Sequence, residues 1–206
     1  MAITINGNGT VTGISVGGLP DGIVDTDMIA TEAVTGAKQA NGSIIQVVST
    51  IMNDNLYWAD AQDWTDITGL AATITPTTNS NKILIYTQVL VANAESNSGD
   101  YTSSLAVKRG GSLLSYDTTG NQGYGDYHKY ISASDAEGNL RSDTAHFMRL
   151  DAPSTDSATT YQICVRPGSS TWDGNDIYIN RLNRSDNDWF NATQVNSSIT
   201  LMEVVA

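Results

Sequence analysis

Short runs of β-branched and aromatic residues, separated by turn-forming residues, recur from Ser43 to the C-terminus. The strongest run is Lys82–Val91, KILIYTQVLV, and the others occur at roughly 8–15-residue intervals. Val, Ile, Thr and Tyr fit a pleated, half-buried surface, and no segment between the runs shows the 3.6-residue apolar period of a helix. The pattern predicts an all-β fold, namely an antiparallel β-sandwich of jelly-roll type.

Ten segments carry this strand pattern, and Asn53–Asn55 is expected to form the turn after the first of them. The expected strands are Ile44–Val48, Ala72–Pro76, Lys82–Val91, Tyr101–Arg109, Leu113–Tyr116, Tyr127–Ala133, Thr144–Leu150, Thr160–Arg166, Ile177–Leu182 and Ser198–Val205.

The composition of the chain changes near Gly42. Residues 1–42 contain eight of the 18 glycines and none of the 15 aromatic residues. Because aromatic side chains supply much of the buried area of a core, this segment cannot build a core of its own. We therefore expect an extended N-terminal arm over residues 1–42 and a β-sandwich head over residues 43–206.

The arm carries apolar pairs at a five-residue spacing, such as Ile23/Val24 and Met28/Ile29. A five-residue step rotates a helix by about 140° net, so these pairs do not share one helical face. We interpret the arm as an anchoring and assembly segment whose apolar residues are buried by partners; the alternative is a floppy terminus. The residues expected to be buried in this way are Ile3, Ile5, Val11, Ile14, Leu19, Ile23, Val24, Met28, Ile29 and Val34.

The charge balance argues against nucleic-acid binding. The chain has 10 Lys and Arg against 22 Asp and Glu, a formal net charge of −12, and its only short basic run is Lys108-Arg109. Non-specific nucleic-acid binding needs clustered cations against the phosphates. No apolar run approaches the roughly 20 residues of a membrane span, and the N-terminus lacks the features of a secretory signal. We therefore expect a soluble protein that is made in a cytoplasm and inserts into no membrane.

Motifs for catalysis are not found. His128 and His146 occur in no spacing that places two imidazoles on one metal, and Gly120–Gly125 lacks the Lys-Ser/Thr of a phosphate loop. Cys164, the single cysteine, is expected to be a small buried apolar side chain. Carboxylates near tryptophans could form the acid pair of a glycosidase, but their spacing selects no geometry. We expect no enzymatic activity, no catalytic residue and no cofactor.

Two segments concentrate oxygen donors, Asp173–Asp176 and Asp186–Asp188. Calcium binds several such oxygens on a flexible backbone. The EF-hand pattern with its terminal Glu is absent, and Asp and Asn are also ordinary turn formers. We prefer the turn interpretation, with calcium binding as the alternative and no metal ligand assigned.

Aromatic residues cluster in the expected loops. Exposed Tyr or Trp beside Asp and Asn suits sugar rings, because the ring stacks on the aromatic face while amides and carboxylates bond the hydroxyls. The same residue types are enriched in subunit interfaces, so both interpretations stay open. The candidate contact residues are Tyr124, Tyr127, Trp172, Asp173 and Trp189.

Several blocks of sequence occur in an order that resembles a known family. They are GSIIQVV at the start of the head, DWTDITGLAATITPTTNSNKILI, LAVKRGGSLL, HFMRLDAPSTDSATTYQICVRPG, IYINR and the closing SSITLMEVVA. With the arm sequence they resemble the small virion fibre proteins of tailed bacteriophages, notably those of marine hosts. Leu150-Asp151-Ala152-Pro153 has Ala where the family usually has Ser. The resemblance implies a homotrimer with its N-terminal part attached to the particle and its β-rich head facing outward.

The expected function is that of a non-enzymatic structural protein of a phage virion. The arm of this fibre or spike would bind other virion proteins, and its outward loops would contact host-surface glycans. Two alternatives are a capsid-decorating protein that covers or clamps the shell, and a glycan depolymerase.

Overall fold

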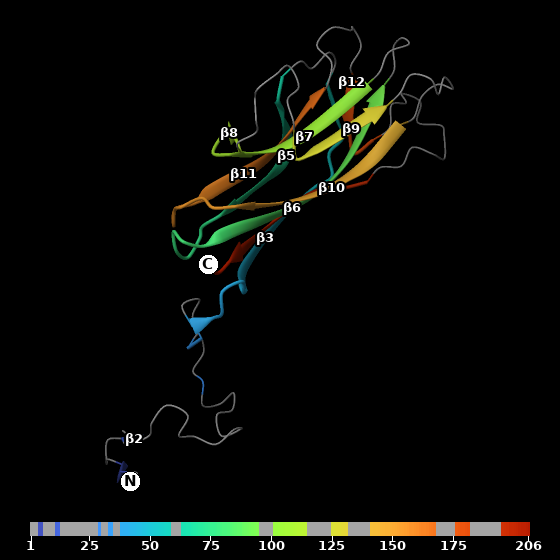
Figure 1. Ribbon diagram of the computed structural model, residues 1–206. Coiled ribbons are helices and arrows are strands. Elements are labelled where there is room, and N and C mark those ends of the chain that lie inside the picture. Colours follow the sequence, from blue (N-terminus) through green and yellow to red (C-terminus); the bar gives the residue numbers. More distant parts are fainter. Residues whose placement is uncertain are drawn as a thin grey trace. The chain divides into compact units, whose positions relative to one another are not determined.

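The computed structural model describes residues 4–5, 11–12, 29, 33–34, 38–58, 63–94, 101–114, 125–131, 141–167, 176–181 and 195–206. The chain divides into two compact units, unit 1 over Met1–Gln39 and unit 2 over Ala40–Ala206 (Figure 1). In unit 1, β1 (Thr4–Ile5) pairs antiparallel with β2 (Val11–Thr12). The role of residues 1–42 as an anchoring arm stays a prediction.

Unit 2 is built from antiparallel strands. The strands are β3 (Ile44–Met52), β4 (Leu56–Trp58), β5 (Thr65–Ile74), β6 (Lys82–Ala94), β7 (Tyr101–Arg109), β8 (Ser112–Leu113), β9 (Tyr127–Ile131), β10 (Arg141–Asp151), β11 (Thr159–Pro167), β12 (Asp176–Ile179) and β13 (Ser197–Val204). They form two sheets that pack face to face (Figure 1). The predicted all-β antiparallel sandwich is confirmed.

The six-stranded sheet is organised around β6. One edge of β6 pairs with β10, and the other edge pairs with β13 over Lys82–Gln88 and with β12 over Val91–Ala94. Beyond these, β3 pairs with β13 and β4 pairs with β12. Because β12 and β13 lie in line, as do β3 and β4, the six strands make four rows, in the order β3/β4, β12/β13, β6 and β10.

The five-stranded sheet is organised around β7 in the same way. One edge of β7 pairs with β11, which in turn pairs with β5. The other edge pairs with β9 over Tyr101–Leu105 and with β8 over Lys108–Arg109. These five strands also make four rows, in the order β5, β11, β7 and β8/β9.

The row order defines the topology. Counted along the chain, the rows run 1-8-3-6 in the six-stranded sheet and 2-7-4-5 in the five-stranded sheet. This is the order of a jelly roll, in which eight strands form two Greek keys. The jelly-roll prediction is thereby confirmed for the part of the chain that the structure describes.

The core lies between the two sheets, where alternate residues of each strand point inward. Its largest fully buried side chains are Ile67, Leu70, Ile74, Ile83, Ile85, Leu105, Tyr161, Ile163, Ile177, Ile179, Ile199 and Leu201. Ile67 and Leu70 are three residues apart yet both face inward, because β5 bulges at Gly69, whose φ is +87°. The side-chain Nε2 of Gln162 bonds the carbonyls of Ile67 and Leu70 at 2.8 and 3.0 Å and so satisfies the bulge.

The two ends of unit 2 differ. At one end, here called the base, the strands are joined through residues 75–81, 110–111 and 152–158, and the chain enters beside its C-terminus. The Gly42 N–H donates to the Val205 carbonyl at 2.7 Å, and the Val205 N–H donates to the Ser43 carbonyl at 3.0 Å. At the opposite end, here called the loop end, β4, β6, β9 and β11 lead into connections that lie outside the described residues.

Candidate functional site

Most of the predicted contact residues lie outside the part of the chain that the structure describes. Tyr124, Trp172, Asp173 and Trp189 lie outside the described residues, as do both proposed calcium segments except the backbone of Asp176. Within the described residues, no group of three or more His, Cys, Asp or Glu side chains could hold a metal ion. The contact role of these four residues stays a prediction.

Tyr127 is the one predicted contact residue whose side chain is described. Its ring packs against the core, and its hydroxyl donates a hydrogen bond to Asp143 on β10 of the opposite sheet. Partial burial, together with this bond to the Asp143 carboxylate, raises the pKa of Tyr127 above its ordinary value. Tyr127 therefore joins the two sheets near the loop end, and its contact with a ligand stays a prediction.

The β8/β9 row is interrupted midway along β7, where the chain leaves after Leu114 and returns at Gly125. Opposite this gap, the Val107 N–H donates to Asp126 Oδ2 at 3.0 Å, and Asp126 Oδ1 accepts a bond from Arg149 at 2.8 Å. The Asp126 side chain thus accepts the backbone hydrogen bond that a continuous strand would have accepted at this point. Gly125 fits here because a Cβ would lie only 2.2 Å from the Leu105 carbonyl oxygen.

The β12/β13 row has a corresponding interruption beside β6. The chain leaves after Asn180, whose φ is +62°, and returns at Ser197, and both residues are fully buried. The Asn180 N–H donates to the Leu90 carbonyl, and the Ser197 hydroxyl accepts from the Leu90 N–H and donates to Asn180 Oδ1 at 2.6 Å. The Asn180 Nδ2 group bonds the carbonyls of Met52 and Asp54 at 2.9 and 3.0 Å. This polar node joins three neighbouring rows at one point.

An aromatic cluster lies next to this node. The rings of Tyr57 on β4 and Tyr178 on β12 are 4.9 Å apart, and the Arg181 guanidinium lies 4.9 Å from the Tyr178 ring centre and 5.9 Å from that of Tyr57. Cations are attracted to aromatic faces at such distances. Sequence reasoning missed this cluster as a candidate site. The only local signal for this cluster was the alternation in β12, where Tyr178 points to one face of the strand while Ile177 and Ile179 point to the other.

The interior of the sandwich contains a second sheet-to-sheet connection, near the base. Arg109 on β7 bonds both carboxylate oxygens of Asp151 on β10, at 3.0 and 2.8 Å. The fully buried Tyr161 donates to Asp151 Oδ2 at 2.7 Å. Burial, with the bond to Asp151 as the second cause, raises the pKa of Tyr161 well above its ordinary value. These contacts fix β10 against the five-stranded sheet.

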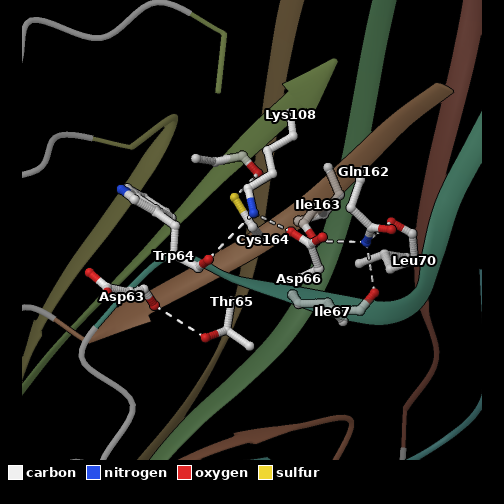
Figure 2. Close-up of polar contacts among 11 residues, drawn as sticks. Asp63, Trp64, Thr65, Asp66, Ile67, Leu70, Lys108, Gln162, Ile163 and Cys164 are labelled. Carbon is white, nitrogen blue, oxygen red and sulfur yellow. Dashed lines mark hydrogen bonds and ion pairs between the residues drawn. The ribbon is translucent and has the colours of Figure 1, made fainter. Parts of the chain in front are cut away.

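The outer face of the five-stranded sheet carries the cysteine beside an ion pair (Figure 2). Lys108 Nζ lies 2.5 Å from Asp66 Oδ1 and 3.4 Å from the Trp64 carbonyl oxygen, while Cys164 is fully buried and contacts the Ala106 carbonyl. Burial raises the pKa of the Cys164 thiol to about 12, with smaller opposing effects from Lys108 and Asp66. The thiol is therefore protonated at neutral pH, as befits a structural rather than a nucleophilic cysteine.

The base is held by a buried carboxylate. Glu203 on β13 is fully buried, and its Oε1 accepts from the Thr77 N–H at 2.6 Å, the Thr77 hydroxyl at 2.7 Å and Asn81 Nδ2 at 2.7 Å. A buried charge must be compensated by hydrogen bonds or an opposite charge. The donors of the β5–β6 connection provide this compensation, so Glu203 fixes that connection against the C-terminal strand.

Four of the residues expected to be buried in the arm are within the described part of the chain. Ile5 and Val11 pair across β1 and β2, and Ile29 and Val34 are exposed in unit 1. Ile3, Ile14, Leu19, Ile23, Val24 and Met28 lie outside the described residues. Burial of these residues by a partner stays a prediction. The described residues include no helix that is long and apolar enough to span a bilayer.

The fold and these sites together define an antiparallel jelly roll with one compact base and one loop-bearing end. No protein-family model matches the chain, and no curated protein sequence matches it. Solved virus structures show a weak likeness. The structure of infectious bursal disease virus strain Gx has 10% identity and a TM-score of 0.36, covering 81% of this chain and 43% of that chain.

The structure of strain Gt of the same virus has 9% identity and a TM-score of 0.36, covering 81% of this chain and 39% of that chain. The VP2 subviral particle of infectious bursal disease virus has 11% identity and a TM-score of 0.31, covering 78% of this chain and 38% of that chain. This chain therefore spans less than half the length of each of these three chains.

Proposed function

We propose that this protein is a non-enzymatic structural component of a phage virion, a fibre or spike that is attached through residues 1–42 and presents the loop end of unit 2 outward. The observation that carries the proposal is the polarity of unit 2. The chain enters unit 2 at the base, beside the C-terminus, whereas the connections of β4, β6, β9 and β11 leave from the opposite end. A chain entry point and a loop-bearing surface at opposite ends of unit 2 suit a displayed head.

Three further features support this proposal. Jelly rolls occur in viral capsid and lectin domains, although the fold alone does not determine function. The sequence blocks that resemble phage fibre proteins span both the arm and the head. The net charge of −12 suits an exterior that stays soluble and does not bind stray nucleic acid.

The proposal includes three kinds of partner. Copies of the chain associate as a homotrimer, other virion proteins hold residues 1–42, and host-surface glycans contact the loop end. The protein is made in the host cytoplasm and resides in the virion. No cofactor is needed for this role.

Particle attachment tests the proposal directly. Particles lacking the protein would be incubated with the full chain or with a chain lacking residues 1–42, and the bound copies would be counted and located by electron microscopy. We expect the full chain to bind at a few defined positions and the truncated chain to be absent. Circular dichroism and protection of the Cys164 thiol from alkylation would verify that the truncated chain is folded.

Attachment of the truncated chain at the normal copy number would disprove the anchoring role. Hundreds of copies spread over the shell would favour the capsid-decorating alternative. Incubation of the full chain with host polysaccharide tests the third candidate, because release of reducing ends would identify a depolymerase.

A further inference from the structure

The two outer faces of the sandwich have different chemistry. The described outward side chains of the five-stranded sheet are mostly polar or charged, and they include Asp66, Thr73, Lys108, Thr160 and Gln162. An antiparallel sheet with one face in water normally shows such a polar outer face. The six-stranded sheet does not follow this rule.

Its outer face carries an apolar row that crosses all four strand rows near the base. Val47 lies opposite Met202, Met202 opposite Leu84, and Leu84 opposite Leu150. Tyr86 and Met148 occupy the next outward positions of β6 and β10, in the row that also contains the polar pair Ser49 and Thr200. Ile51 occupies the outward position of β3 beyond Ser49. Together these residues form the apolar face: Val47, Ile51, Leu84, Tyr86, Met148, Leu150 and Met202.

Four of these side chains are open to solvent in the single chain, and the other three are half-buried. Val47, Ile51, Met148 and Leu150 are between 54% and 67% exposed. Of the large apolar side chains that are exposed in the described part of unit 2, all belong to β3, β4 or β10 of this one sheet. Soluble monomers rarely expose a contiguous apolar patch of more than a few hundred Å².

The apolar face is also free of negative charge, although the chain has 22 Asp and Glu. The strands of this sheet carry three carboxylates with described side chains, Asp143, Asp151 and Glu203. All three point into the sandwich, where they bond Tyr127, Arg109 and Thr77 respectively. Copies with a net charge of −12 repel one another, so a carboxylate-free face is where they can approach at least electrostatic cost.

The sheet surface that contains the apolar face is large enough for self-association. Four rows about 4.8 Å apart and about 11 residues long, at about 3.4 Å per residue, give the whole outer face of the six-stranded sheet an area of about 700 Å². A standard protein interface buries roughly 800 Å² per partner. The apolar face consists of Met, Tyr and branched aliphatic residues, without Asp or Glu, and this composition is typical of an interface core.

We propose that the apolar face packs against the same face of further copies of this chain. The proposal deepens the proposed function, because it names the surface through which the homotrimer forms. It does not depend on virion attachment. A sugar ligand fits this face poorly, since its side chains are mainly aliphatic and offer few hydrogen-bonding groups.

Analytical ultracentrifugation of the purified full chain tests this proposal without any particle. Val47→Glu and Met148→Glu place a charge on opposite edges of the face, on β3 and β10. We expect the wild type to sediment as an oligomer and each variant to associate at least about tenfold more weakly, because a charge would be desolvated without a partner. Thr73→Glu, on the outer face of the other sheet, is the matched control and should keep the wild-type mass.

Hydrogen exchange of the wild type gives a second measurement that needs no variant. Amides of β3 and β10 should exchange more slowly in a concentrated solution than in a dilute one, while those of β5 should not change. A wild type that stays monomeric at concentrations up to about 100 μM would refute the proposal. The proposal would also be refuted if both face variants kept the oligomer mass of the wild type. Equal amide exchange of β3 and β10 at both concentrations would refute it as well.

The result is independent of the attachment test. A monomeric chain that binds particles through residues 1–42 would remove the self-association proposal and leave the virion role in place. An oligomeric chain that fails to bind particles would remove the virion role and leave the self-association proposal in place. Protection of the apolar face only on the particle would assign the face to another virion protein and so overturn the choice of partner.

Discussion

Thr87 on β6 is buried between Phe147 and Ile199 of the neighbouring strands, and its hydroxyl has no hydrogen-bond partner among the described residues. A buried, unbonded hydroxyl loses its hydration without compensation. We therefore expect Thr87→Val, which replaces the hydroxyl with a methyl group, to raise the free energy of unfolding by about 1 kcal/mol. Urea denaturation at neutral pH would measure this change.

Thr73→Val provides the comparison for this substitution. Thr73 is exposed on β5, and its hydroxyl lies 2.7 Å from the Thr160 hydroxyl. The same chemical change should therefore give no gain in stability at this position. An equal gain at both positions would mean that strand propensity, and not the unbonded hydroxyl, is responsible.

Tyr161 makes the free energy of unfolding depend on pH in the alkaline range. Its pKa is raised in the folded chain, chiefly by burial and then by its bond to Asp151. Above about pH 10 the unfolded chain releases this proton while the folded chain keeps it, so the free energy of unfolding falls as pH rises. One such group lowers the free energy of unfolding by up to about 1.4 kcal/mol for each pH unit. Below about pH 10 its stabilising effect is fully present.

Tyr161→Phe tests this dependence. The variant should be less stable at neutral pH, because Asp151 loses one donor, and its stability should fall less steeply between about pH 10 and pH 11. Urea midpoints measured across this range for both proteins would give the two slopes. If the stability of the two proteins fell equally steeply with pH, this pH dependence would not come from Tyr161.

At the level of strands, the Asn180 node is expected to stabilise the interrupted row. Asn180→Ala removes the donors to Met52 and Asp54 and the acceptor of Ser197, and it places a Cβ-bearing residue at a φ of +62° without a compensating side chain. We expect the free energy of unfolding to fall by about 3 kcal/mol. Denaturation of the two proteins would measure the difference.

Asn180→Gly separates the two contributions to this loss. It removes the same side-chain bonds but accepts the left-handed backbone conformation at no cost. It should therefore be less destabilising than Asn180→Ala. If the glycine variant were as stable as the wild type, the side-chain bonds would contribute nothing.

The sequence predicted most strands but not their interruptions. Alternation and turn residues placed Tyr101–Arg109 and the starts of β3, β6 and β9 at their observed positions. The strand expected over Ile177–Leu182 ends at Ile179, because Asn180 adopts a left-handed conformation, and the strand expected to start at Leu113 ends there instead. The short β4 (Leu56–Trp58) was missed, since its pairing depends on β12, more than 100 residues away.

The candidate sites were harder to predict for the same reason. The Asn180 node joins the residue that follows β12 to residues of β3, β6 and β13, and no local pattern places these together. The apolar face did have a local signal in β6. Leu84, Tyr86 and Leu90 alternate with the buried Ile83 and Ile85, and a strand that is apolar on both sides is typical of burial on both sides.

For the whole molecule, the net charge of −12 predicts how association responds to salt. The apolar face contributes no carboxylate, so salt would weaken no ion pair there, while it would screen the repulsion between the copies. Self-association should therefore become tighter when NaCl is raised from about 0.02 M to about 0.5 M. Sedimentation equilibrium would measure the dissociation constant, and weakening by salt would indicate an interface held by ion pairs.

The strand interruptions at Asp126 and at the Asn180 node have a consequence for how the molecule can vary. Because side chains complete the hydrogen bonding of β7 and β6 at these points, the backbone bonds of the described strands there are satisfied without a continuous neighbouring strand. Lengthening such an excursion costs only closure entropy, about 0.6 kcal/mol for each doubling. We therefore expect peptides inserted at both places to leave the described strands folded, which would allow the chain to display them.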